Sequence, residues 1–190
     1  MSDQEDLIII DKTLKGDTEA FAVIIKKYQN MVFKYVYSKF NSYEEAQDIS
    51  QEIFIMSIEA LASFRRESKF STWLYSIMIN YCKNYRKKNS RFSLVPLNYS
   101  KGGEETELQI PDDRENPEQD VVDGDSIRIL KEEIRNLPDD YKDILILRDI
   151  DGLAYGEISE ILGINLSNVK VRIHRGRELL KNRLYSRGLV

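Results

Sequence analysis

The segment between residues 93 and 125 limits the fold more than any other feature, because it cannot form part of a packed core. Positions 100–125 hold ten Asp or Glu residues against two basic ones. The segment also contains Pro96, Pro117 and the pair Gly102-Gly103, which interrupt regular structure. Such a composition buries too little apolar surface to offset the entropy of ordering the chain. The expected organisation is an N-terminal domain, a flexible acidic linker and a C-terminal domain, over residues 1–92, 93–125 and 126–190.

The N-terminal part shows helical spacing of its apolar residues and no sustained period-two alternation. One stretch with this spacing runs over residues 17–39. Ser42 followed by Glu45 fits a capping box that opens a second helix, with an apolar stripe continuing to Met56. A third helix begins near Ser71 and runs toward a basic Arg-Lys-Lys sequence. These patterns predict an all-helical first domain.

The C-terminal part repeats the helical spacing and ends in two short helices separated by Gly163. Pro138 suits the first turn of a helix. Gly163 can take the left-handed conformation that a sharp turn needs. We expect Asn165 or Ser167 to cap the last helix. The apolar residues expected to join the two short helices are Ile158, Leu162, Val169 and Ile173. The pattern predicts a helix-turn-helix, and the alternative is a helical hairpin with a solvated basic side.

The net charge of −4 conceals two basic blocks on either side of the acidic segment. Residues 65–91 contain eight Lys or Arg residues against Glu67, and residues 166–190 contain seven against Glu178. Blocks of this kind suggest two surfaces for a polyanion, separated by a segment that must avoid it. The alternative is that both blocks are solvated helix faces.

Several classes of function have no support in the sequence. Cys82 and His174 are the single residues of their types, which excludes an internal disulfide and disfavours a Cys/His metal site. No apolar stretch has a length typical of a membrane helix, and the N-terminus does not resemble a secretory signal. We also find no catalytic constellation and no glycine-rich phosphate loop. We therefore expect a cytoplasmic protein that is not an enzyme and has no cofactor, no metal and no membrane insertion.

Four stretches, taken in order, resemble one known family. They are GDTEAFAVIIKKYQNMVFKYV, DISQEIFIMSIEAL, FRRESKFSTWLYSIMINYCKNYRKK and LPDDYKDILILRDIDGLAYGEISEILGINLSNVKVRIHRGRELLKNRL. The chain resembles bacterial RNA polymerase sigma factors of the sigma-70 family, in the extracytoplasmic-function (ECF) subfamily. This resemblance implies an all-α protein with a region 2 helical bundle and a region 4 helix-turn-helix. It implies three partners: the clamp coiled coil and flap of core polymerase, promoter DNA, and an anti-sigma factor.

The resemblance assigns each part a role in transcription initiation. Asp48, Gln51 and Glu52 would bind the basic clamp coiled coil, because acids and amides suit Arg-rich partners. Capture of a flipped −10 base needs a pocket, donors and cations. The residues implied for that task are Phe64, Arg65, Arg66, Ser68, Asn80, Lys83 and Asn84. Trp73 is expected in the core, while Tyr75 and Tyr81 remain open between the two roles.

The last helix would read the −35 element. Lys170 and Arg175 are the expected base contacts, with Val171 and His174 beside them. The expected phosphate contacts are Arg172 and Arg177. The chain departs from the family pattern at Gly156, Ser159 and Val171 and near Ser167, and the effect of these departures on promoter preference stays open.

Two other functions remain open at this stage. A two-domain helix-turn-helix regulator would bind duplex DNA without polymerase, but that interpretation does not explain the basic, aromatic stretch from Phe64 to Arg91. An RNA-binding or scaffold protein would use both basic blocks without taking part in initiation.

Overall fold

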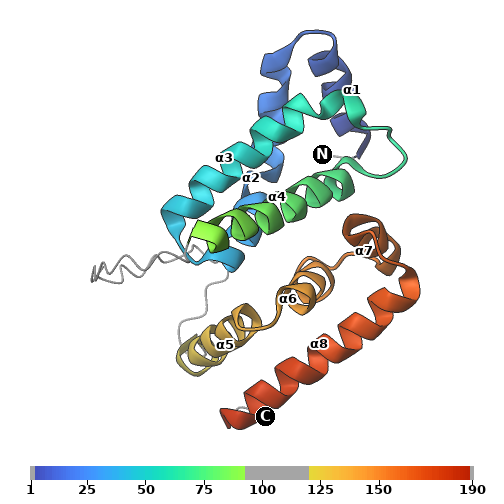
Figure 1. Cartoon of the computed structure of the whole chain (residues 1–190). Helices are drawn as coiled ribbons and strands as arrows, with labels where there is room; N and C mark the ends of the chain where they lie inside the picture. Colours follow the sequence, from blue (N-terminus) through green and yellow to red (C-terminus); the bar gives the residue numbers. More distant parts are fainter. Residues whose placement is uncertain (1–2, 93–119, 189–190) are drawn as a thin grey trace.

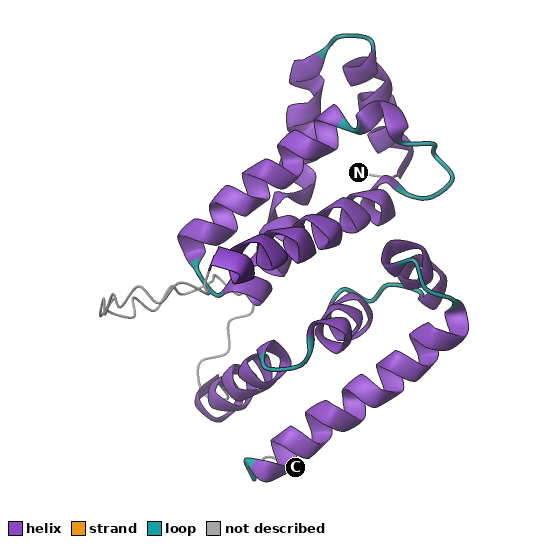
Figure 2. Cartoon of the chain, viewed as in Figure 1, coloured by secondary structure: helices purple, strands orange, loops and turns teal. Residues whose placement is uncertain are grey.

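A computed structural model describes residues 3–92 and 120–188. These residues form helices joined by turns, and no strand occurs within them (Figure 2). The all-α class predicted from the sequence is confirmed. Most of the segment predicted as a linker, residues 93–119, lies outside the described residues.

Four α-helices form the N-terminal half: α1 (Asp3–Leu14), α2 (Phe21–Phe40), α3 (Tyr43–Glu59) and α4 (Phe70–Phe92). Short 3-10 turns, η1 (Thr18–Ala20) and η2 (Leu61–Ser63), join neighbouring helices. Three of the four helices correspond to stretches predicted from apolar spacing. The spacing did not predict α1.

The predicted start of α3 is confirmed in its main feature. The Ser42 hydroxyl accepts a hydrogen bond from the backbone N–H of Glu45 at 3.3 Å, which satisfies one of the free donors at the start of the helix. Before it, α2 ends at Asn41, whose φ of 55° is left-handed. Asparagine tolerates this conformation better than most residues, so the chain reverses sharply between α2 and α3.

A shared apolar core holds the N-terminal half together. Ile24 and Val32 from α2, Ile53 from α3 and Met78 from α4 are completely buried. The prediction for Met56 was wrong, since the spacing placed it in the buried stripe and its side chain is 42% exposed. Phe54 and Ser57 are buried instead, so the inward face of α3 includes these two residues and excludes Met56.

The C-terminal half consists of α5 (Asp120–Arg135), α6 (Asp139–Leu145), α7 (Tyr155–Leu162) and α8 (Leu166–Ser186). Pro138 precedes α6, as its fixed φ favours. After α6 the chain widens into one π-helical turn, η3 (Ile146–Ile150). The backbone of α5 begins at Asp120, so its first six residues lie inside the segment predicted as a linker.

The predicted helix-turn-helix is present in α7 and α8. Gly163 has a left-handed φ of 63°, and the Asn165 side chain accepts a hydrogen bond from the Asn168 N–H at 2.8 Å. Ile158 and Val169 are completely buried between the helices. Leu162 is only half-buried, and Ile161 takes the buried position that the spacing assigned to Leu162.

The two halves lie side by side, with α4 against α6 and α7 (Figure 1). The Tyr75 hydroxyl donates a hydrogen bond to Asp151 at 2.9 Å, and the Ser76 hydroxyl donates to the carbonyl of Ile161 at 3.5 Å. Lys69 also forms an ion pair with Glu157 at 2.9 Å. The sequence analysis did not predict this contact between the halves.

Candidate nucleic-acid interface

The outward face of α3 carries the acidic group predicted to bind polymerase. Asp48, Gln51 and Glu52 are all exposed, while the adjacent residues Ile49 and Ile53 are buried in the core. These three polar side chains can therefore meet a partner without disturbing the fold.

The same region of α3 has an apolar part that the sequence analysis missed. Ile55 and Met56 are 49% and 42% exposed, and they lie three and four residues after Glu52. Residues at these spacings are neighbours on a helix surface. Because Met56 fits the apolar stripe in the sequence, only the packing shows that it faces outward beside Ile55.

On α8, the predicted base contacts lie away from the hydrophobic core. Lys170, Val171, His174 and Arg175 are all exposed. Lys170 and Arg175 form no ion pair within residues 3–92 and 120–188, so their cations are open to solvent.

The predicted phosphate contacts on α8 are held by acids of the same half. An Arg172 nitrogen lies 3.5 Å from an Asp140 oxygen. Arg177 donates from Nε to Asp149 at 3.1 Å, and this hydrogen bond raises the pKa of its guanidinium. These pairs fix the two guanidinium groups beside the free cations of the helix.

A hollow of about 340 Å³ opens along this side of α8. Tyr155, from the start of α7, closes one side of it. The residues of α8 that line it follow helical spacing and are mostly basic: Lys170, Ile173, His174, Arg177, Glu178 and Lys181. Lys170, Arg177 and Lys181 thus line a shallow hollow on this side of the helix-turn-helix.

The loop before α4 has its aromatic residues turned inward. Phe64 is buried, and its ring centroid lies 5.6 Å from that of Phe70 and 5.3 Å from that of Trp73. Trp73 packs against the core, as the sequence predicted. The sequence left open whether Tyr75 and Tyr81 belong to the core or to the base-binding surface. Tyr75 is buried, and Tyr81 is half-buried with its ring stacked on Tyr85.

Arg66 gives this loop an unusual backbone. Its φ of 61° is left-handed, which is uncommon for a residue other than glycine. The guanidinium reaches back to α1, with one nitrogen 3.4 Å from Asp11. Arg65 beside it is exposed and Ser68 is half-exposed, so the loop presents polar groups outward.

Asn80, Lys83 and Asn84 form a second polar group on α4. They are exposed, and their spacing of three and four residues puts them on one face of the helix. Asn80 lies ten residues after Phe70, which is about 15 Å along the helix axis. The structure therefore brings these three residues together, while the loop residues Phe64–Ser68 form a separate group at the start of α4.

Three further results bear on other kinds of function. Burial raises the pKa of the Cys82 thiol to about 12. Within the described part of the chain, no group of three or more His, Cys, Asp or Glu residues could hold a metal ion. None of the described helices has the length and apolar character needed to span a membrane.

Comparison with known proteins gives two family matches in the same chain. Sigma-70 region 2 matches residues 24–92, and Sigma-70 region 4 matches residues 127–180. The first match covers α2 to α4, and the second covers most of the C-terminal half, including the whole of α7.

Curated relatives extend the similarity over nearly the whole chain. The ECF RNA polymerase sigma factor SigW of Bacillus subtilis is 38% identical over 176 residues, covering 92% of this chain and 94% of its own. The ECF RNA polymerase sigma-E factor of Haemophilus influenzae is 33% identical over 186 residues, covering 94% and 95%.

A solved structure shows the same fold. It contains the sigma factor RpoE in complex with the anti-sigma factor NepR, from Bartonella quintana. The similarity has a TM-score of 0.66 at 20% identity, and it covers 87% of this chain and 96% of that one. Together with the two region matches, these relatives show that the chain belongs to the ECF group of the sigma-70 family, the promoter-directing subunits of bacterial RNA polymerase.

Proposed function

We propose that this sigma factor binds core polymerase through α3, opens the −10 element with its N-terminal half and reads the −35 element with α8. The observation that carries this assignment is the order of the region 2 and region 4 matches, combined with an exposed acidic face on α3 and free cations on α8. The polymerase then performs the chemistry, so the chain itself needs no catalytic group. The site of action is the cytoplasm, where polymerase and promoter DNA are found.

Transcription in vitro tests this function directly. The full chain is added to core polymerase on a pool of promoter fragments, and the starting points of transcripts are sequenced. Initiation at a defined subset of fragments is the expected result. Duplex binding without core, and no initiation with it, would instead favour a helix-turn-helix regulator.

The domain limits follow from the same assignment. We assign region 2 to residues 1–92 and region 4 to residues 126–190, joined by residues 93–125. The region matches support these limits, since they end at residue 92 and resume at residue 127.

Asp48 and Glu52 form the charged part of the polymerase anchor, with Gln51 between them. Changing Asp48 and Glu52 to Lys reverses two exposed charges and should weaken core binding strongly while preserving helix content. The matched control changes two exposed acids elsewhere to Lys, Glu19 and Glu160, and should bind core normally. Equal affinities of the two folded variants for core polymerase would show that Asp48 and Glu52 are not the polymerase anchor.

Asn80 and Asn84 hold a base that has left the duplex, with Lys83 on the nearby backbone. Unstacking and unpairing a base costs a few kcal/mol, which contacts to the flipped base must offset. Asn80→Ala should therefore leave the closed complex intact and slow opening. A template already mismatched around the −10 element should partly restore opening.

Permanganate reactivity of unpaired thymines measures that opening. The control is Asn89→Ala, an equally exposed amide farther along α4 that has no proposed role. Opening at the wild-type rate by Asn80→Ala on the matched template would place the base pocket elsewhere. We assign the loop residues Arg65, Arg66 and Ser68 to the same strand, with buried Phe64 supporting the loop from within.

Lys170 and Arg175 contact base edges of the −35 element, beside Val171 and His174. Arg172 and Arg177 bind phosphates. Lys170→Ala should relax the preference at one base and cost about 1–3 kcal/mol. Arg172→Ala should weaken all promoters alike and lower the salt dependence of binding. Selection from a random −35 library distinguishes the two effects, and identical behaviour of both variants would contradict the division.

An anti-sigma factor is a further proposed partner. The support is the fold shared with RpoE, which was solved in complex with the anti-sigma factor NepR. Purification of the tagged chain from its own host, followed by identification of an equimolar partner that blocks initiation, tests this proposal.

A further inference from the structure

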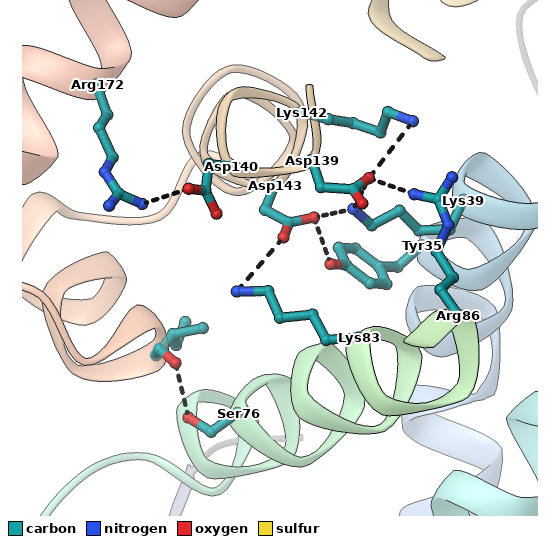
Figure 3. Close-up of polar contacts among 11 residues, drawn as sticks. Tyr35, Lys39, Ser76, Lys83, Arg86, Asp139, Asp140, Lys142, Asp143 and Arg172 are labelled. Carbon is teal, nitrogen blue, oxygen red and sulfur yellow. Dashed lines mark hydrogen bonds and ion pairs between the residues drawn. The ribbon is translucent and has the colours of Figure 1, made fainter. Parts of the chain in front are cut away.

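A polar cluster joins the two halves of the chain. From the N-terminal half come Tyr35 and Lys39 on α2, with Lys83 and Arg86 on α4. From the C-terminal half come Asp139 and Asp143 on α6, which point toward these groups (Figure 3).

Asp143 lies at the centre of this cluster. It forms an ion pair with Lys39 and accepts a hydrogen bond from the Tyr35 hydroxyl at 2.7 Å. The Asp143 and Lys39 side chains are only 1% and 2% exposed. The second Asp143 oxygen has no hydrogen-bond partner, and the Lys83 nitrogen lies 3.9 Å from it. One oxygen of a buried carboxylate is thus left incompletely satisfied in the closed chain.

Asp139 forms the half-exposed rim of the cluster. It pairs with Arg86, and Lys39 lies 3.2 Å away. Burial alone would raise the pKa of Asp139, but these two cations hold it below its ordinary value. The carboxylate is therefore fully charged in the closed chain.

The direction of the charges is nearly constant across the contact. The N-terminal half supplies cations and hydroxyls, and the C-terminal half supplies the carboxylates, including Asp151 opposite Tyr75 and Glu157 opposite Lys69. Lys142 on α6 adds one cation from the C-terminal half, 3.9 Å from Asp139. One hydrogen bond runs the other way, from Arg135 to Asn41 at 2.7 Å. The α4 cations Lys83 and Arg86 belong to the basic block predicted to meet promoter DNA. Arg86 pairs with Asp139 and Lys83 lies beside Asp143, while both cationic side chains remain partly exposed.

We propose that Tyr35, Lys39, Lys83 and Arg86 form a binding site for DNA backbone phosphates, which Asp139 and Asp143 occupy while the chain is closed. The site extends the surface of Asn80 and Asn84 along α4 and onto α2, and in this sense it rests on the proposed function. When the halves separate, the carboxylates leave together, and phosphates replace them on the same nitrogens. The two carboxylates therefore weaken the affinity of the closed chain for DNA phosphates at this site.

Separation of the halves can be measured by energy transfer between two dyes. Gln29→Cys and Asn182→Cys place labels at exposed sites, one in each half. The native Cys82 is buried and its thiol pKa is raised to about 12, so it should resist labelling. Asp139→Asn removes one carboxylate from the rim and should lower the transfer efficiency. The control Glu160→Gln removes one exposed carboxylate of the same half that faces no cation of the cluster, and it should leave the efficiency unchanged.

Binding of a short single-stranded DNA of mixed sequence separates opening from phosphate binding. Asp139→Asn should bind this DNA several-fold more tightly at low salt. Its logarithmic salt slope should steepen by about 0.7 for each additional phosphate that the chain neutralises. Arg86→Gln should open the halves as well but increase the affinity less, because it removes a phosphate ligand.

Each result has a distinct meaning. Unchanged energy transfer in an Asp139→Asn/Asp143→Asn double variant would show that the acids do not hold the halves together. Opening without tighter DNA binding would show that the cations are no phosphate site. Equal DNA affinities for Asp139→Asn and Arg86→Gln would also exclude a phosphate site. Any of these three results leaves the proposed function intact if the wild-type chain still directs initiation with core polymerase. Absence of initiation would refute the proposed function, whatever the energy transfer shows.

Discussion

Lys39→Met tests the buried pair at the centre of the contact. Methionine keeps much of the length of the lysine side chain and removes its charge, which leaves Asp143 buried with Tyr35 as its remaining hydrogen-bond donor. Removing one partner of a buried ion pair costs about 3–5 kcal/mol, because the other charge stays uncompensated. The chain has a cheaper response, since separation of the halves returns Asp143 to water. The cost should therefore appear in the equilibrium between closed and open chains, shifted a hundredfold or more toward the open form.

A double-mutant cycle completes this test. Asp143→Asn in the Lys39→Met chain leaves no buried charge at this position, so much of the closure should return. The assay is energy transfer between residues 29 and 182 during a urea titration, followed in parallel with helix content. Transfer should be lost at lower urea in Lys39→Met than in the wild type, while the loss of helix moves little. If the two substitutions act additively, Lys39 and Asp143 are not coupled and the reasoning fails.

Three further predictions concern other parts of the chain. A Cβ at Gly176 on α8 would lie 3.2 Å from Leu145 on α6, so Gly176→Leu should overpack this contact. The expected loss of stability is about 1–3 kcal/mol, measured by thermal unfolding. An unchanged melting temperature would show that the two helices can move apart. Asn165→Ala removes the cap of α8 and should cost about 1 kcal/mol, visible as faster amide exchange at Asn168 but not in α3. Burial raises the pKa of three tyrosines above 10.0, so they stay protonated in the folded chain while the unfolded chain ionises near that value. Stability should then fall as pH rises above about 10, and tyrosine absorbance that titrates fully before helix is lost would contradict this. The three tyrosines are Tyr28, Tyr35 and Tyr75.

Local signals in the sequence account for much of the secondary structure. Ser42, Pro138 and Gly163 mark helix ends by mechanisms that depend on one residue and its nearest neighbours along the chain. The apolar stripes were less informative where packing against other helices decides which side chains are buried. Met56 and Leu162 fit the expected spacing, yet the neighbouring residues Ser57 and Ile161 are the buried ones, because the packing of the facing helices decides which side chains are covered.

Helix α1 and the contact between the halves depend on residues far apart in the sequence. Asp6 is buried because Lys27 and Tyr28 both bond to its carboxylate at 2.6 Å, and nothing near Asp6 in the sequence indicates this. Asp139 and Lys39 are likewise separated by one hundred positions. Charge segregation predicted two polyanion surfaces, but an acid in the C-terminal half gives no sign in the sequence that it pairs with the N-terminal half. The roles proposed for the site residues follow from the family resemblance, because no local pattern in the sequence distinguishes a polymerase contact from a DNA contact.

The π-helical turn η3 restricts how sequences of this type can diverge. A π-turn holds more residues per turn than an α-helix, and here it lets Asp149 reach Arg177 on one side while Asp151 reaches Tyr75 on the other. Loss of one residue between Ile146 and Ile150 would rotate everything downstream by roughly 100° about the helix axis. Insertions and deletions should therefore be rare between Pro138 and Gly163 in descendants of this chain. Evolutionary change in length is expected to accumulate between α4 and α5, where the family matches leave a gap.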